Sequence, residues 1–136
     1  MPRIYKRRPL LSNEEGVKRL AKRLTRTLKK KIDAIYVKKI LRDPDKPHKD
    51  LYGLLVDNKI YLGKRKHQKT KTPLVMTLIH ELIHEAFPSM PEKIVLNTER
   101  KLYRCLAETE KLRLKKYINI FKAQIPTHEI KHTPPR

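Results

Sequence analysis

The sequence predicts one α+β domain, in which a small antiparallel or mixed sheet packs with three helices. Apolar residues recur at helical spacing in both halves of the chain, and β-branched and aromatic residues concentrate between residues 32 and 62. A chain of 136 residues is long enough for one hydrophobic core. We expect the domain to cover 1–123, with a basic N-terminal segment at 1–11 and an extended tail containing proline and histidine at 124–136.

The domain is expected to begin with an amphipathic helix that leads into a strand. Ser12 and Glu15 have the spacing of a capping box. Apolar residues follow at helical spacing with lysines and arginines between them, which predicts a helix over about 12–30. The next stretch, 32–41, is rich in β-branched and aromatic residues and is therefore predicted to form a strand.

A β-hairpin is predicted over 51–62, after a loop at 42–50 that contains two prolines. Two apolar runs in this segment flank Asp57 and Asn58. Both residue types tolerate the left-handed backbone conformation that a tight two-residue turn needs. The second and third helices are predicted over about 73–87 and 90–122.

His67 and Cys105 could in principle bind a metal or react, but the sequence predicts neither role for them. His67 lies in a stretch at 63–71 that reads as a basic loop, so its ring is expected to face solvent and not to bind a metal. Cys105 is the only cysteine, which excludes a disulfide within the chain. Because Cys105 follows the apolar pattern of the last helix, we expect a buried structural thiol.

The predicted helix at 73–87 contains His80-Glu81-Leu82-Ile83-His84, which matches the pattern H-E-x-x-H. Thr72 is a suitable N-cap with Pro73 at the first helical position, and Pro88 ends the helix. Two histidines and a glutamate are unusual in a helix that is otherwise apolar, because polar groups are costly to bury without partners.

The spacing of the motif points to a metal site. Residues i and i+4 lie on the same face of a helix, so the imidazoles of His80 and His84 can reach one ion. Glu81 lies beside them, where it can exchange protons with a water molecule without binding the metal. Neutral histidines with an adjacent acid/base carboxylate are typical of hydrolytic zinc sites, so we expect one Zn²⁺ per chain.

A third protein ligand should come from the last helix. Glu99 is preferred, because a helix that returns after a short turn reaches the depth of the metal near 97–99. Glu92 is the alternative, although Ser89 and Glu92 have capping-box spacing, which would give Glu92 a structural role. Glu108 and a histidine of the tail also stay open.

The order of these elements around His80, Glu81, His84 and a downstream glutamate resembles the zincin metallopeptidases. It is most similar to the minigluzincins of the gluzincin tribe, with the SprT-like zincins second. The resemblance covers roughly 35–118 and implies a minimal zincin-like domain. It also implies a zinc endopeptidase that hydrolyses peptide bonds of a peptide or protein substrate, and an edge strand of the hairpin that binds the substrate backbone above the active-site helix.

Further roles follow within this interpretation. Glu81 would be the general base, and Tyr103 could add stabilisation of the oxyanion. Minigluzincins are also known in latent forms that are blocked by their own C-terminal segments. In this chain His128 or His132 could take the open position on the metal, which would make the protein a zymogen.

The net charge of +20, from 34 Lys and Arg against 14 Asp and Glu, favours anionic partners. Because the basic residues are spread along the sequence, we expect weak, non-specific binding of nucleic acid. The alternative function is a basic DNA- or RNA-associated SprT-like protein, in which zinc is structural or proteolysis is coupled to nucleic acid. The chain has neither an apolar run of membrane-spanning length nor a secretory signal, so a cytoplasmic protein is expected. Asn and Gln are few, whereas Lys, Ile and Pro are frequent, a composition that is compatible with a thermophilic source.

Overall fold

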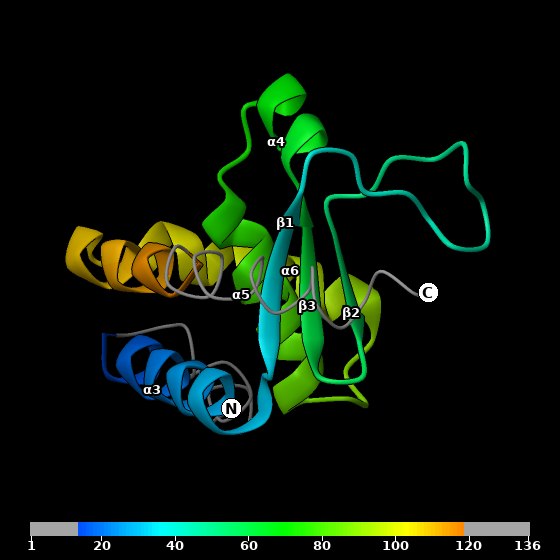
Figure 1. The fold of residues 1–136 in the computed structure, drawn as a ribbon. Coiled ribbons are helices and arrows are strands. Elements are labelled where there is room, and N and C mark those ends of the chain that lie inside the picture. The colour runs from blue at the N-terminus through cyan, green and yellow to red at the C-terminus, as the bar shows by residue number, and fades with distance from the viewer. Residues whose placement is uncertain (1–13, 119–136) are drawn as a thin grey trace.

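The computed structural model describes residues 14–118, which form a mixed α+β arrangement (Figure 1). This confirms the predicted fold class at the level of its architecture. The segments 1–11 and 124–136 lie outside the described residues. In chain order the elements are α3 (Glu14–Lys31), β1 (Ala34–Lys38), β2 (Gly53–Val56), β3 (Lys59–Gly63), α4 (Lys64–Thr70), α5 (Leu74–Ala86) and α6 (Glu92–Cys105), followed by helical residues 108–118.

The sheet has three strands in the order β1-β3-β2. The central strand β3 pairs in parallel with β1 and antiparallel with β2, so β2 forms one edge of the described sheet. The hairpin turn falls at the predicted residues: Asp57 has a φ of 48° and Asn58 a φ of 64°. Two consecutive left-handed residues match the right-handed twist of the flanking strands, which fixes the register of β2 on β3.

Helix α5 is the centre of the core. Its residues Leu78, Ile79, Leu82 and Ile83 are fully buried. They belong to the same apolar cluster as residues from the sheet, from α3 and from α6, represented by Ile35, Ile60, Leu24, Leu28 and Val95. Such a helix must be apolar on several sides, which explains why its polar residues are informative. It begins one residue later than predicted, with Pro73 as an N-cap without a side-chain hydrogen bond.

The predicted basic loop at 63–71 is wrong, because these residues form α4. Gly63 is the N-cap of this helix, and Lys71 ends it in the left-handed conformation with a φ of 58°. The sequence pattern does not predict this helix, because the helix has no apolar face. Its one buried residue is His67, which is 3% exposed. The prediction that His67 faces solvent is therefore also wrong.

The predicted long helix at 90–122 is interrupted in the structure. Helix α6 ends at Cys105, Leu106 is extended with a ψ of 141°, and helical structure resumes at 108. The change of direction places Leu106 and Leu114 in the core. The buried residues of α6 are Val95, Glu99 and Leu102, and Cys105 is not on that face of the helix. The predicted burial of that thiol is wrong, since Cys105 is exposed.

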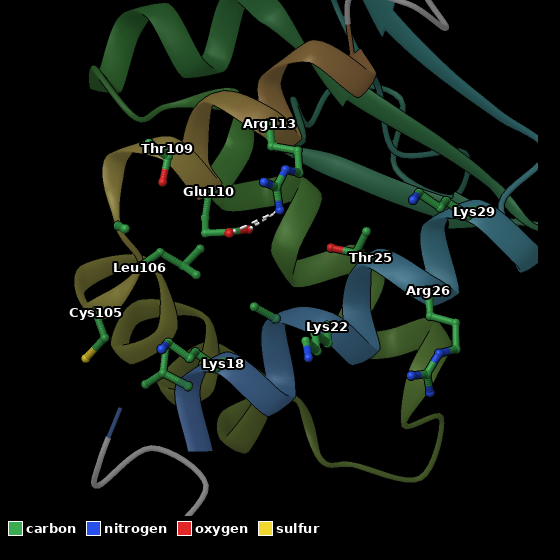
Figure 2. Close-up of a pocket in the computed structure, with 13 residues that line it drawn as sticks. Lys18, Lys22, Thr25, Arg26, Lys29, Cys105, Leu106, Thr109, Glu110 and Arg113 are labelled. Atoms are coloured by element: carbon green, nitrogen blue, oxygen red, sulfur yellow. Dashed lines mark hydrogen bonds and ion pairs between the residues drawn. The ribbon is translucent and has the colours of Figure 1, made fainter. Parts of the chain in front are cut away.

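The turn after α6 and the facing side of α3 border an open pocket of about 940 Å³ (Figure 2). Apolar residues of both segments, including Val17, Ala21 and Leu106, contribute to its lining, and lysines and arginines of α3 lie along it. None of the helices in the described part of the chain combines the length and the apolar character needed to cross a bilayer.

Candidate metal centre

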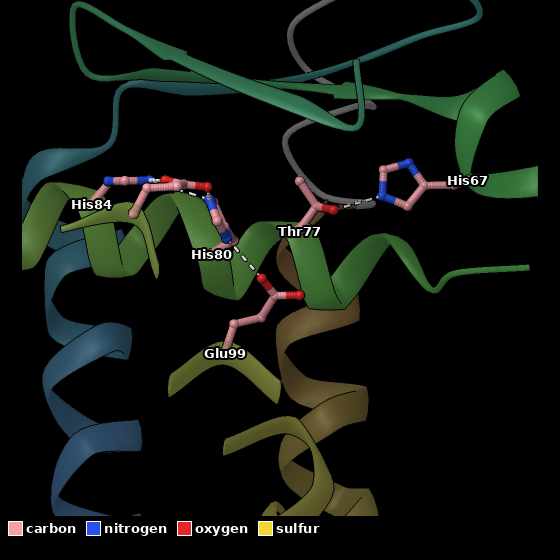
Figure 3. A network of polar contacts seen from close by, with 6 residues as sticks. His67, Thr77, His80, His84 and Glu99 are labelled. Atoms are coloured by element: carbon pink, nitrogen blue, oxygen red, sulfur yellow. Dashed lines mark hydrogen bonds and ion pairs between the residues drawn. The ribbon is translucent and has the colours of Figure 1, made fainter. Parts of the chain in front are cut away.

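His80 and His84 lie on one face of α5 with their rings close together (Figure 3). Their Nε2 atoms are 3.2 Å apart and their ring centroids 4.8 Å apart. The side chains are 13% and 28% exposed, so both rings reach the surface from a helix that is otherwise buried. The i, i+4 spacing thus brings the two nitrogens to one point, as the sequence predicted.

Glu92 brings a carboxylate to the same point. Its Oε1 lies 2.8 Å from Nε2 of His84, and its Oε2 lies 3.2 Å from Nε2 of His80. Glu92 is the first residue of α6, and the short connection after α5 carries it back over the histidines. Ligand atoms of His80, His84 and Glu92 all lie within 4.8 Å of one another. The Glu92 side chain is 59% exposed, so this group opens to solvent.

Glu99 contacts the opposite edge of the His80 ring. Nδ1 of His80 donates a hydrogen bond to Oε1 of Glu99 at 2.7 Å, and Glu99 is buried. A proton held on Nδ1 by a carboxylate leaves the lone pair of Nε2 free. A carboxylate in this position sets the tautomer and orientation of a ligating histidine and increases its basicity.

The structure thus separates the two glutamates that the sequence proposed as third ligand. The preferred residue, Glu99, is not in the convergent group, whereas the alternative, Glu92, is. The capping box that argued against Glu92 does not form, because Pro91 is the N-cap of α6 and no side chain caps it. Ser89 therefore leaves Glu92 available to the histidines.

Glu81 is buried beside the histidine pair and beneath the edge strand. It is 7% exposed, and a side-chain carbon added to Gly53 of β2 would lie 3.1 Å from its Oε2. Burial raises the pKa of Glu81 to about 7, with a further increase from Glu92 and Glu99 and an opposing decrease from His80. A carboxyl group with a pKa near neutrality can both accept and return a proton.

The carboxylates also affect His80. Burial lowers the pKa of this imidazole, but the hydrogen bond with Glu99 and the charges of Glu81, Glu92 and Glu99 outweigh that effect and raise it above 6.5. The electrostatic potential of the group is negative, because the carboxyl groups of Glu81, Glu92 and Glu99 surround the two histidines. Such a site favours a bound cation.

His67 forms a second polar network, which the sequence did not predict. Its Nδ1 donates to the carbonyl oxygen of Gly63 at 2.6 Å, and its Nε2 accepts from the hydroxyl of Thr77 at 2.7 Å. Thr77 precedes Glu81 by one turn, and its methyl group would collide with any side chain at Gly53. No periodic signal marks His67 in the sequence, and the hydroxyl at the buried position Thr77 is the only hint of a polar partner.

Other residues singled out from the sequence lie away from this group. Tyr103 packs against the core, and the ammonium of Lys111 lies 4.2 Å from its ring centroid. Glu108 is exposed and forms an ion pair with Lys111. The tail histidines, His128 and His132, lie outside the described residues.

The distances are close to those of a tetrahedral zinc site. Two nitrogen or oxygen ligands bound about 2.1 Å from such an ion lie about 3.4 Å from each other. The two Nε2 atoms are 3.2 Å apart, and the two oxygens of Glu92 lie 2.8 Å from His84 and 3.2 Å from His80. Each separation is slightly shorter than a zinc site requires, so small side-chain movements would be needed to admit the ion.

Comparison with known proteins supplies no relative for this chain: no family model, no curated protein and no solved structure matches it. The function of the protein is therefore inferred from the geometry of the site.

Proposed function

We propose that this protein is a zinc-dependent endopeptidase. The observation that carries the proposal is the convergence of His80, His84 and Glu92 beside a buried glutamate that lies under an edge strand. A site of three protein ligands leaves a fourth position for water or substrate, which distinguishes catalytic zinc sites from structural ones. We include in this proposal that the fold is zincin-like and that the chain is related to the minigluzincins.

In this proposal His80 and His84 bind the metal through Nε2, and Glu92 binds it through its carboxylate. Glu99 is a positioning residue, because it contacts the metal only through the ring of His80. When bound, zinc would supply a Lewis acid that polarises the scissile carbonyl and lowers the pKa of water. The mixed nitrogen and oxygen donors suit zinc better than they suit magnesium or calcium, which prefer oxygen alone.

Glu81 performs the proton transfers. As a carboxylate it takes a proton from the attacking water, and as a carboxylic acid it returns that proton to the leaving amine. Burial raises the pKa of Glu81 to about 7 in the metal-free protein, and the positive charge of a bound zinc ion would lower it, which would favour the carboxylate form that accepts the proton. Within the described residues, the contacts of Tyr103 are with the core and with Lys111, so Tyr103 is given no oxyanion role here.

The edge strand β2 provides a place for the substrate. Within the described sheet β2 pairs on one side only, with β3. An extended peptide can add to such an edge through main-chain hydrogen bonds, largely independent of its sequence. Because Gly53 of β2 lies against Glu81 and Thr77, a peptide bound there passes close to the acid/base residue.

The test is hydrolysis of an unfolded protein substrate by zinc-loaded wild type and by Glu81→Gln, with the protein also assayed without residues 124–136. We expect Glu81→Gln to bind zinc as wild type does and to lose hydrolysis by about 10²-fold or more. Glu85→Gln on the same helix is the matched control and should retain activity. Equal activity of Glu81→Gln and wild type would contradict the mechanism.

Latency through the tail stays a prediction of this proposal. If His128 or His132 occupies the open metal position, the shortened protein cleaves faster than the full chain and binds zinc equally well. Equal rates in the two proteins would exclude autoinhibition by the tail and leave the peptidase assignment intact.

A further inference from the structure

The solvent face of α3 is uniformly basic. Beyond Glu15, every exposed residue of this helix is a lysine or an arginine, and no acidic residue occurs between 16 and 32. The opposite face is apolar and fixed in the core. The exposed cations are Lys18, Arg19, Lys22, Arg23, Arg26, Lys29, Lys30 and Lys31.

Most of the charges on this face form no ion pair within the described part of the chain. Arg23 makes other contacts within the fold: its guanidinium donates to the carbonyl oxygen of Ala86 at 3.4 Å and lies 4.6 Å from the centroid of the Phe87 ring. For the remaining cations of α3, the described residues supply no ion-pairing carboxylate. Concentrated, uncompensated charge of one sign destabilises a compact protein, so an external polyanion would relieve it.

The cations also form an ordered row. Lys18, Lys22, Arg26 and Lys29 recur at intervals of three or four residues and line the pocket beside α3 (Figure 2). Each interval advances about 4.5–6 Å along the helix, and the 18 residues of α3 span about 27 Å. The row itself, from Lys18 to Lys29, covers about 16 Å of the helix, which is enough to contact successive phosphates of a nucleic acid.

The side chains that α3 lacks distinguish between kinds of polyanion. A helix that binds an anionic membrane needs apolar anchors beside its cations. The exposed large apolar residues in the described part of the chain are Val56, Ile94 and Leu112, none of which lies on α3. Binding of single strands uses aromatic rings that stack on bases, and α3 contains no aromatic residue. A duplex presents phosphates on a rigid rod and requires neither feature.

We propose that the exposed face of α3 binds the phosphate backbone of duplex DNA without sequence specificity. The major groove of B-DNA is about 12 Å wide, so an α-helix can lie between its two phosphate backbones, whereas duplex RNA is recognised mainly through 2′-hydroxyl groups and phosphates across a shallow minor groove. Helix α3 has neither Asn nor Gln, the residues that recognise adenine, and its lysines and arginines can contact phosphates of any sequence. In Figure 3, α3 and the sheet lie on opposite sides of α5, so bound DNA would leave β2 accessible.

The test compares two matched variants of the full chain. The first carries K18Q, K22Q, K29Q and K30Q on α3, and the second carries K46Q, K49Q, K64Q and K69Q in the 42–50 loop and α4. All eight lysines are exposed, and both variants lose the same charge. Arg23 is left unchanged because it packs on α5. Affinity for a short DNA duplex of arbitrary sequence is measured between about 50 and 200 mM salt, alongside single-stranded DNA, duplex RNA and phosphatidylserine-containing vesicles.

The α3 variant is expected to bind the DNA duplex about tenfold more weakly or worse, with the slope of log affinity against log salt reduced by about three to four. The second variant should keep the wild-type slope. Equal losses in both variants would show diffuse attraction and overturn the assignment to α3. Tighter wild-type binding to vesicles, to single strands or to duplex RNA would overturn the assignment to duplex DNA. The assay needs no zinc and no proteolysis, so its result is independent of the peptidase proposal.

Discussion

Two histidine networks lie along helix α5, and they differ in every property that decides whether a histidine can bind a metal (Figure 3). At one end, His67 is fully buried with both ring nitrogens hydrogen-bonded to neutral groups. At the other end, His80 and His84 are part-exposed, their Nε2 atoms point at each other, and carboxylates surround them. Because His67 is buried and both of its ring nitrogens are hydrogen-bonded, the first network is structural. Convergence and negative charge make the second a candidate site.

Burial has opposite effects on the two networks. It lowers the pKa of His67, where the Gly63 carbonyl compensates only in part and Lys66 opposes protonation. At His80 the carboxylates reverse the effect of burial and raise the pKa. The comparison shows that the number of buried histidines is a poor indicator of function. The partners of each nitrogen are a better one.

The largest effects are expected when one histidine is removed from each network. We expect His84→Ala to abolish tight zinc binding at little cost in stability, because its side chain is 28% exposed. We expect His67→Ala to keep zinc binding and to lower the free energy of unfolding by about 2–4 kcal/mol, since it leaves a cavity and unpaired groups at Gly63 and Thr77. Zinc titration and denaturant unfolding measure the two effects. The opposite pattern would show that the roles are reversed.

Gly53 lies where the two networks meet, beside Thr77 of the first and Glu81 of the second. Its added carbon in Gly53→Ala would collide with Thr77 and approach Glu81. Overpacking of this kind costs about 1–3 kcal/mol of stability, and it should move β2 away from the acid/base residue. We expect slower hydrolysis in addition to a lower unfolding midpoint. A Gly53→Ala protein of wild-type stability and activity would contradict the close approach of β2 to α5.

The smallest effect should appear in the pH dependence of stability. The lowered pKa of His67 means that the folded protein binds fewer protons at this residue than the unfolded chain does. Its contribution is therefore complete above the ordinary pKa of 6.5 and is lost as the pH falls below that value, with a slope of at most about 1.4 kcal/mol per pH unit. The stability of wild type minus that of His67→Gln should decrease between about pH 7 and pH 5. A difference that is independent of pH would contradict the burial of a neutral imidazole.

Features encoded by local chemistry could be predicted from the sequence. The apolar helix with its histidines and the Asp57-Asn58 turn both occur where the pattern placed them. Helix α4 could not be found in this way, because its only inward side chain is the polar His67. The break after Cys105 has neither glycine nor proline to mark it and depends on the packing of Leu106 in the core.

The sequence could not predict which nitrogens of the histidines Glu92 and Glu99 contact. Glu99 lies beside His80 at the depth that the sequence predicts, but an imidazole has two nitrogens that face in opposite directions, and Glu99 contacts Nδ1. Which carboxylate meets which nitrogen depends on side-chain rotamers and on how α6 begins. Pro91 as N-cap leaves Glu92 free to reach both Nε2 atoms.

The zinc content and zinc affinity of wild type, Glu92→Ala and Glu99→Ala decide whether His80, His84 and Glu92 form a metal site. We expect about one zinc per wild-type chain, which follows from a single three-ligand site. We expect a severe loss of binding in Glu92→Ala and an affinity reduced by about 10–100-fold in Glu99→Ala, as expected for a positioning carboxylate. Wild type that binds no zinc, or a severe loss in Glu99→Ala with binding retained in Glu92→Ala, would contradict this assignment.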